Sequence, residues 1–327
     1  MDIKKKDMNI DVSIVIVCMN NLKNLYPCLE SINKYTTVSY ETLVVAYLFS
    51  KENLEKVKKD FPWVTFIESN EIRGFSENNN LALRQAKGKY CFVLNDDTEM
   101  KMDVVGGLVK TIESLPENVA IVSPKLLYPN GEIQVCGRPP FGIKQYIKRG
   151  FNIWNEKRNG GKYSNQTGVF ETYNIIGAAF LIKNEIFKEY DFFDERYFFC
   201  PEDIALSTSL NKTGFKCYVD SNLEIIHYEG GSGIQNVSKL KMATNPAGEK
   251  GTIIFLSDGN VLINNILSCF SALLSLLRAI KYKAKSKKHM DDNYILFKAN
   301  LNTCFAVFSS KTPKQIFQKY YSLNINS

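Results

Sequence analysis

The sequence is poor in the residues that bind structural metals, because it has two histidines and no C-x-x-C pair among its eight cysteines. This scarcity argues against a structural zinc site. Cys18, Cys91 and Cys217 lie inside apolar runs, which indicates reduced core residues rather than a disulfide framework. The first 11 residues are polar and lysine-rich, without the apolar stretch of a secretory signal. We therefore expect a cytoplasmic protein.

The first 247 residues also lack a charge excess of either sign. From residue 248 onward the chain has 11 Lys and Arg against four Asp and Glu, which accounts for the net charge of +7. A nucleic-acid groove would need a basic surface on the body of the protein. The charge distribution therefore argues against a nucleic-acid partner.

The basic excess follows a long apolar stretch in the tail. Residues 261–280 are mostly apolar but include two asparagines, serines and Arg278, and five lysines follow within residues 281–288. This pattern fits a helix that lies on an anionic membrane surface through residues 261–288, at the cytoplasmic face of the inner membrane. It fits equally a helix that packs on the rest of the chain or on a partner in a homodimer. The polar residues make a full membrane span the least favoured interpretation.

The remaining pattern predicts an α/β fold. Short apolar runs alternate with helical periodicity, which is typical of a mostly parallel sheet with helices on both faces. Strands are expected at 11–19, 42–48, 63–67, 90–94 and 119–123, and helices at 22–35, 53–61, 76–86 and 104–115. Residues 125–172 are rich in Gly and Pro and predict a long loop. Later strands are expected at 173–182, 215–219 and 224–228, and a helix at 202–212.

Two carboxylates follow the strand at 90–94 directly, in Asn95-Asp96-Asp97-Thr98. Open α/β sheets bind ligands beyond the carboxyl ends of their strands. Adjacent carboxylates repel each other unless a cation compensates them, so a divalent metal is a natural ligand here. The alternative is that Asp97 and Thr98 only cap the next helix.

Two further sites carry ionisable groups. Glu202 and Asp203 begin a helix, where the helix dipole favours ionised acids, and His227 ends a strand. Taken alone, Glu202-Asp203 is more often a helix cap, and a single histidine after two isoleucines is more often a half-buried structural residue. The residue types do not decide between these interpretations.

The order of these motifs resembles family 2 glycosyltransferases of the GT-A fold, in particular the rhamnosyltransferase-like enzymes of bacterial surface polysaccharides. The resemblance covers residues 10–235, in segments 12–17, 20–21, 74–82, 88–90, 94–98, 123–126, 130–134, 176–182, 193–198, 202–206, 213–215 and 226–227. It implies a nucleotide-sugar-binding half (1–125), an acceptor-binding half (126–245) with a mixed sheet portion, and a helical tail (246–327).

The resemblance also implies residue roles. Asp97 matches the metal ligand, with Asp96 beside it near the nucleotide and His227 completing a site for Mn or Mg. Asp203, next to Glu202, matches the catalytic base of an inverting transfer. The residues that would bind the nucleotide-sugar are Cys18, Asn20, Arg73, Gly74, Asn80, Asn95 and Asp96.

Two departures from the family pattern concern specificity. Ala46 stands where relatives carry an aspartate that contacts the base, and Ala205 replaces the second aspartate of the motif at Glu202-Asp203. We expect an enzyme that transfers sugar from dTDP-rhamnose or a UDP-sugar to a glycan or lipid-linked glycan. The alternative is a non-catalytic relative that binds a sugar or a partner. A sugar-phosphate nucleotidyltransferase would need a glycine-rich loop after the first strand, and Cys18-Met19-Asn20-Asn21 is not one.

Overall fold

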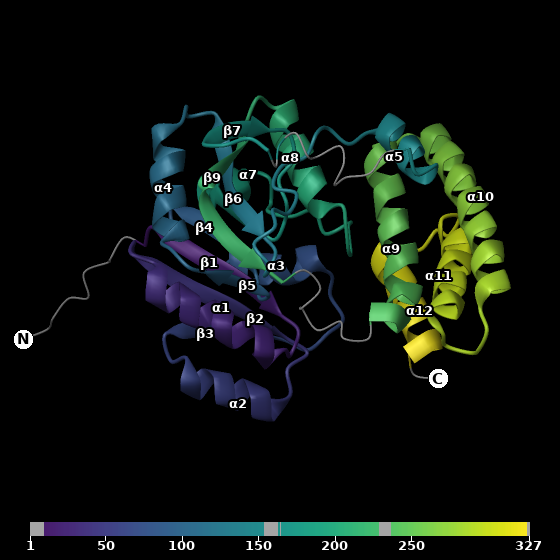
Figure 1. Cartoon of the computed structure of the whole chain (residues 1–327), viewed down its shortest axis with the longest axis horizontal. Coiled ribbons are helices and arrows are strands. Elements are labelled where there is room, and N and C mark those ends of the chain that lie inside the picture. Colours follow the sequence, from purple (N-terminus) through teal and green to yellow (C-terminus); the bar gives the residue numbers. More distant parts are fainter. Residues whose placement is uncertain (1–9, 154–162, 164, 229–236, 326–327) are drawn as a thin grey trace, which may run out of the picture.

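A computed structural model describes residues 10–153, 165–228 and 237–325, together with residue 163. Within it, an α/β body lies beside a group of helices formed by the C-terminal part of the chain (Figure 1). We call this group the helical module; it comprises α9 (Val237–Ser257), α10 (Val261–Lys285), α11 (Asp292–Ala306) and α12 (Pro313–Ile325).

The first half of the sheet is parallel and runs in the order β3-β2-β1-β4. It contains β1 (Val12–Cys18), β2 (Tyr40–Tyr47), β3 (Val64–Ser69) and β4 (Tyr90–Asn95), with helices α1 (Leu22–Tyr35), α2 (Lys51–Asp60), α3 (Phe75–Leu83) and α4 (Val104–Ser114). Ile14 and Ile16 pack into one core layer with α1 and α4, whereas Val15 packs into the other with α3. Helices cover both faces, which is why these strands read as continuous apolar runs.

The second half of the sheet is mixed. Beyond β4 the order continues β8-β6-β9-β5, with β7 paired to β9, and β8 is antiparallel to both β4 and β6. The elements of this half are β5 (Thr98–Met100), β6 (Val119–Leu127), α5 (Ile143–Gly150), β7 (Val169–Thr172), β8 (Ala179–Lys183), α7 (Asn184–Glu189), α8 (Glu202–Lys212) and β9 (Lys216–His227). This arrangement confirms the predicted fold class, including the helical C-terminus.

Some element boundaries differ from the prediction. The two strands expected at 215–219 and 224–228 form one strand, β9, because a register shift opposite Pro124 and Lys125 accommodates residues 221–223 as a bulge within a continuous strand. β8 begins at Ala179 rather than at 173. The expected loop at 125–172 contains α5, whose Tyr146 is buried in a small apolar cluster with Leu267.

The helical module is joined closely to the α/β body. A buried cluster links Phe198 to Ala243 of α9 and Phe317 of α12, and the Phe198 and Phe317 rings lie 4.5 Å apart. Lys314 adds a 2.6 Å ion pair to Glu77 of α3. The expected boundary at 245 falls inside α9, and the one at 125 falls inside β6.

α9 approaches the backbone of the chain just before α8. A Cβ atom on Gly248 would lie 2.9 Å from the carbonyl oxygen of Phe199, and one on Gly251 would lie 2.8 Å from that of Cys200. Glycine at these positions lets the helix pack against the 199–200 backbone. The helical module therefore supports the segment that leads into Glu202 and Asp203.

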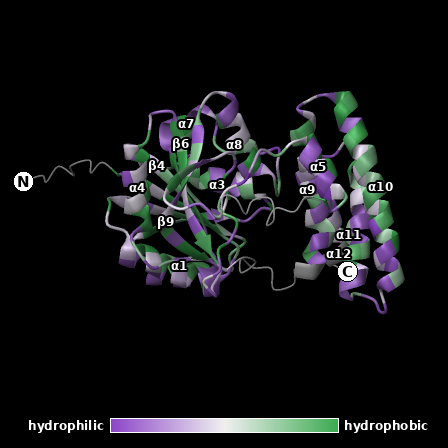
Figure 2. Cartoon of the chain, turned by 45° about the horizontal axis from the view of Figure 1, so that its top comes forward, coloured by the Kyte–Doolittle hydropathy of each residue, from purple (hydrophilic) through white to green (hydrophobic). Residues whose placement is uncertain are grey.

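α10 has two different sides. Hydrophobic residues run along the helix in Figure 2, and the side chains of several of them are exposed to solvent. The exposed ones are Val261, Leu262, Ile266, Leu273, Leu276, Leu277 and Ile280. By length and composition α10 is the one described helix that could cross a membrane, and 28% of its apolar window is buried in the protein.

Candidate active site

The turn after β4 brings Asp96 and Asp97 to the carboxyl edge of the sheet, and both side chains are almost completely buried. The Thr98 hydroxyl donates to the Asn95 carbonyl (2.7 Å), which holds this turn. Helix α4 is capped by Asp103, whose carboxylate accepts from the Gly106 amide (2.9 Å). The alternative that Asp97 and Thr98 serve as a helix cap is therefore wrong.

His227 lies beside Asp97 because β5 and β9 pair with Thr98 opposite His227. The His227 Nε2 atom is 3.3 Å from Asp97 Oδ1. Two electron-rich atoms at this separation need a proton or a cation to compensate them. The sheet register thus brings together two residues that are 130 positions apart in the chain.

Gln134 determines which nitrogen of His227 carries a proton. Its amide Nε2 donates to the His227 carbonyl oxygen (2.6 Å), an atom that can only accept, so its Oε1 must face His227 Nδ1 (2.9 Å). Nδ1 therefore carries a proton, and Nε2, which faces Asp97, is the nitrogen that could bind a cation. This is a tautomer that binds metals.

These side chains fit a divalent cation with oxygen and nitrogen ligands, such as Mn or Mg. The Oδ2 atom of Asp96 is buried and has no hydrogen-bond partner among the described residues, as expected of an oxygen that a cation would compensate. In the described part of the chain, no group of three or more His, Cys, Asp or Glu residues forms a complete cage. Ions of this class commonly take one or two protein ligands and complete their shell with phosphate oxygens and water.

The electrostatics of Asp96 agree with this fit. Burial, with a further contribution from the Asp97 carboxylate, raises the pKa of Asp96 to about 7. Near neutral pH the carboxyl group is therefore close to the midpoint of its titration. A cation beside it would favour the ionised form.

A cavity of about 220 Å³, which we call the donor cavity, opens beside Asp96. Arg73 and Gly74 line it from the segment before α3, and Asn95 and Asp96 line it from the end of β4. The far wall comes from the helical module. It consists of Leu240, Thr244, Phe317 and Tyr321.

Three predicted nucleotide-binding residues do not line the donor cavity. Cys18 is buried beside it, where its thiol interacts with Asp96 and also donates to the Asn21 carbonyl (3.5 Å). The Asn20 side-chain oxygen accepts from Asn53 Nδ2 (2.9 Å). Asn80 is fully buried and its amide donates to the Phe193 carbonyl (2.8 Å), so it positions the acceptor half and does not line the cavity.

The neighbour Asn78, which sequence reasoning did not assign to the site, lines the donor cavity in place of Asn80. Ala46 is buried in β2, and the next residue, Tyr47, supplies the cavity wall. Where the family pattern has an acid, this chain therefore presents aromatic surface. Phe317 and Tyr321 stack on each other with centroids 5.3 Å apart.

Glu202 and Asp203 occupy the first turn of α8, and Pro201 is the capping residue, so the two acids are not a helix cap pair. Asp203 Oδ2 accepts from Arg138 Nη1 (2.8 Å) and from the Gly177 amide (3.1 Å). Glu202 accepts from the Cys200 amide (2.6 Å). Burial and the adjacent Asp203 carboxylate raise the pKa of Glu202 to about 7.

One short segment connects the two groups of acids. The Gly177 amide donates to Asp203, and the carbonyl of the following residue, Ala178, accepts from the Asn95 amide (2.9 Å). The Asp203 carboxylate and the end of β4 are thus hydrogen-bonded to two adjacent residues of the same segment. The structure brings together the motifs at 95–97, 202–203 and 227 around one edge of the sheet.

The family model for Glycosyl transferase family 2 matches residues 13–191 of the chain, which is more than half of its length. The chain belongs to glycosyl transferase family 2.

Two curated relatives are similar to this family 2 chain. It is 28% identical over 155 residues to the O-antigen biosynthesis protein RfbC of Myxococcus xanthus, a match covering 47% of this chain and 12% of that protein. It is 26% identical over 234 residues to the uncharacterized protein y4gI of Sinorhizobium fredii, covering 68% of this chain and 25% of that protein. The chain thus matches a quarter or less of the length of each.

Solved structures share the fold. GalNAc-T7 with UDP, GalNAc and Mn2+ has a TM-score of 0.55 and 18% identity, covering 67% of this chain and 43% of that one. The mannosyltransferase PcManGT from Pyrobaculum calidifontis, in complex with GDP-Man and Mn2+, has a TM-score of 0.52 and 14% identity, covering 98% of this chain and 81% of that one. At these identities the likeness establishes the GT-A fold of the family 2 chain.

Sequence reasoning missed the roles of Gln134 and Arg138 in this family 2 site. Gln134 lies in the segment 130–134 that resembles the family, but nothing in the sequence indicated that its side chain contacts His227. Arg138 follows Gly137 in the Gly- and Pro-rich stretch, where no periodicity indicates which way a side chain points. Its ion pair with Asp203 spans 65 residues.

Proposed function

We propose that the protein transfers a sugar, with inversion, from a nucleotide-diphosphate sugar to a hydroxyl group of a glycan or lipid-linked glycan in polysaccharide synthesis. dTDP-rhamnose or a UDP-sugar is the proposed donor. The observation that carries the proposal is the position of Asp97 and His227, 3.3 Å apart, where the donor cavity ends at Asp96. The name of the Myxococcus relative supports the polysaccharide context.

The donor would lie with its nucleotide in the donor cavity and its diphosphate toward Asp97 and His227. Tyr47 and Tyr321 offer aromatic surface for the base. The Arg73 guanidinium, which pairs with the exposed Glu71 carboxylate (3.0 Å), would bind phosphate oxygens after leaving that partner. A divalent cation held by Asp97 and His227 would neutralise the charge that develops on the departing diphosphate.

Asp203 is the proposed general base. Its carboxylate would take the proton of the acceptor hydroxyl while that oxygen attacks the anomeric carbon on the side opposite the diphosphate, which inverts the configuration. Arg138 and the Gly177 amide hold Oδ2 in one orientation, and the Ile204 amide donates to Oδ1 (2.8 Å). The base is therefore positioned before the acceptor arrives.

We further propose that α10 brings the enzyme to the cytoplasmic face of the inner membrane as a peripheral protein. Its exposed leucines and the lysines at 281–288 suit an anionic leaflet, where a lipid-linked acceptor would be found. A homodimer formed through the same face is the alternative to this surface.

A panel of nucleotide-sugars, each tested with and without Mn by thermal shift, tests the donor assignment. We expect one nucleotide class to raise the melting temperature in the presence of Mn, and that donor to be hydrolysed slowly without acceptor. Binding of a free sugar with no nucleotide effect would instead favour a non-catalytic sugar-binding relative.

A further inference from the structure

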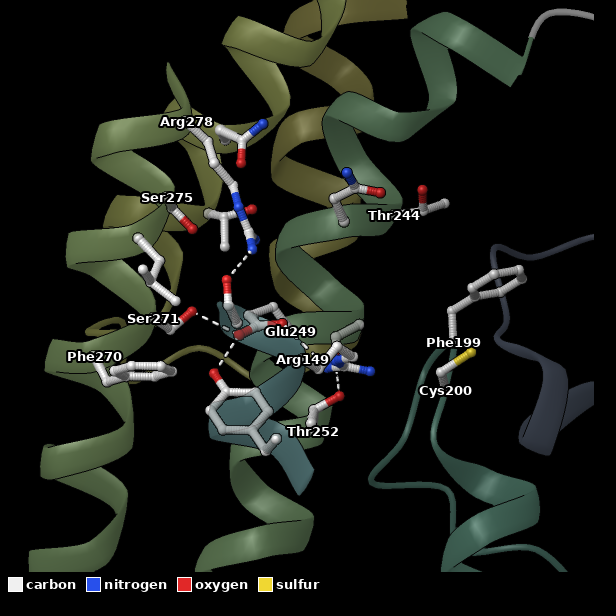
Figure 3. A pocket seen from close by; sticks show the side chains of 17 residues that line it. Arg149, Phe199, Cys200, Thr244, Glu249, Thr252, Phe270, Ser271, Ser275 and Arg278 are labelled. Atoms are coloured by element: carbon white, nitrogen blue, oxygen red, sulfur yellow. Dashed lines mark hydrogen bonds and ion pairs between the residues drawn. The ribbon is translucent and has the colours of Figure 1, made fainter. Parts of the chain in front are cut away.

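A second cavity, of about 370 Å³, lies between the α/β body and the helical module. We call it the polar cavity. Figure 3 shows α10 on one side, with Ser271, Ser275 and Arg278, and the backbone at Phe199 and Cys200 on the other. Arg149 of α5 and Glu249 of α9 also line it.

The charge of the polar cavity is positive. Arg278 donates to the Gly150 carbonyl (2.7 Å) and forms no ion pair with any carboxylate of the described residues. Arg149 Nη2 lies 4.0 Å from Glu249 Oε2, at the limit of an ion pair. Glu249 is already held through its other oxygen, which accepts from Ser271 (2.6 Å) and from Tyr146. The cavity lining therefore contains two guanidinium groups and one carboxylate, and one oxygen of that carboxylate already accepts two hydrogen bonds.

The polar cavity adjoins the donor cavity, since Phe199 and Thr244 line both. It also contacts Cys200, two residues before Glu202. A molecule held in the polar cavity can thus extend past Phe199 toward the start of α8. On this geometry the cavity lies on the acceptor side of the site.

We propose that the polar cavity binds an anionic phosphate or diphosphate group of the acceptor through Arg149 and Arg278. This proposal rests on the proposed function, in which the protein transfers a sugar to an acceptor molecule. Guanidinium groups bind phosphate oxygens in pairs of parallel hydrogen bonds, and the Ser275 hydroxyl lines the cavity beside them. An acceptor anchored in this way has one end fixed while a sugar hydroxyl reaches Asp203.

The opposite side of α10 suggests where such an anion comes from. Ser271, Ser275 and Arg278 face the polar cavity, whereas Leu273 and Leu277 are exposed on the same helix. A lipid diphosphate could keep its chain on the apolar side and its phosphates in the cavity. A soluble sugar phosphate offers the same phosphate chemistry without the chain.

Calorimetric titration of the metal-free full chain in EDTA tests the proposal, with inorganic pyrophosphate as the probe. We expect saturable binding by the wild type, and affinity at least tenfold weaker in Arg278→Gln and in Arg149→Gln, as for the loss of a charge-assisted pair. Lys110→Gln, which removes an exposed positive charge from α4 on the α/β body, is the matched control and should bind like the wild type. Melting temperatures establish that each variant is folded.

Three outcomes would overturn the proposal: no saturable binding by the wild type, unchanged affinity in both folded arginine variants, or loss of binding in Arg73→Gln alone, which would put the anion in the donor cavity. Farnesyl diphosphate as a second probe separates the two sources, because tighter binding than pyrophosphate indicates a lipid. The nucleotide and Mn panel on the wild type is read separately, so failure of the donor assignment and failure of the anion site are distinguishable.

Discussion

The side-chain amide of Gln134 holds His227 by two hydrogen bonds, one to its Nδ1 atom (2.9 Å) and one to its carbonyl oxygen (2.6 Å). The pair spans 93 residues and joins the start of the Gly- and Pro-rich stretch to the end of β9. It leaves Nε2 of the ring directed at Asp97. Gln134, which contacts the ring on its Nδ1 side, thereby leaves Nε2 as the nitrogen that could bind a cation.

Replacing Gln134 with Leu should weaken Mn binding by about tenfold, because outer partners of metal-bound histidines contribute this much. Mn titration followed by electron paramagnetic resonance measures the affinity directly, without reference to turnover. Gln85→Leu, on the surface of the α/β body, is the control and should bind Mn like the wild type. Equal Mn affinity of Gln134→Leu and the wild type would show that the amide does not orient the ring.

Asp203→Asn should lower the transfer rate by roughly 10²- to 10⁴-fold, the usual contribution of a positioned general base. Nucleotide binding should stay close to that of the wild type, because Asp203 does not line the donor cavity. Asp258→Asn removes an exposed carboxylate paired with Lys212 and serves as the control. Transfer near the wild-type rate in Asp203→Asn would refute the base assignment.

The Arg138–Asp203 ion pair should stabilise the fold, and the effects of replacing Arg138 and Asp203 on the free energy of unfolding should not be additive. Arg138→Met leaves a buried carboxylate without its cation and should reduce the free energy of unfolding by about 3 kcal/mol. In the Asp203→Asn background the same change should cost less, and urea unfolding of the four proteins measures the difference. Lys216→Met, in a solvent-exposed pair with Glu171, is the control and should leave the stability close to that of the wild type. Additive effects of the two changes would argue against a coupled pair.

Glu202 should make the folded protein less stable as the pH rises. Its pKa is raised from 4.5 to about 7 by burial. Between these values the unfolded chain loses the proton that the folded chain keeps, so stability falls with rising pH and levels off above about 7. Glu202→Gln stays neutral and still accepts from the Cys200 amide, so its melting temperature should fall less between pH 5 and 8. Scanning calorimetry of both proteins without metal measures this, and parallel curves would exclude the effect.

Leu277→Glu should reduce binding to vesicles that contain anionic lipids, because it puts a charge into the exposed apolar side of α10, where Leu277 is 55% exposed. Flotation with such vesicles measures the bound fraction. Gln85→Glu adds the same charge on the α/β body and should float like the wild type. A wild-type chain that stays at the bottom of the gradient but shows a concentration-dependent dimer in sedimentation would assign the surface to self-association.

The parts of this protein that could be predicted from sequence are those in which neighbouring residues share one environment. β4 is buried on both faces and ends in Asp96 and Asp97, so its apolar run and its polar end both show in the sequence. The family order of the motifs then connected these acids to Asp203 and His227. The contact between Asp97 and His227 depends on the antiparallel pairing of β5 with β9, and β5 was not among the predicted strands.

The remainder depends on long-range contacts that leave no local pattern. α3 carries three adjacent asparagines, and only the packing of Asn80 against Phe193, 113 residues away, leaves Asn78 to face the cavity. Arg138 lies in a stretch without periodicity. Phe317 and Tyr321 join the donor cavity from a helix more than 200 residues beyond the end of β4.

The position of α12 has a consequence for how the protein matures on the ribosome. A nascent chain that has emerged only as far as α11 already contains the sheet and all the acidic residues of the site. It lacks Phe317 and Tyr321, which form part of the cavity wall, and Lys314, which pairs with Glu77. The wall of the donor cavity is therefore complete only after α12 has been synthesised and has docked on the α/β body.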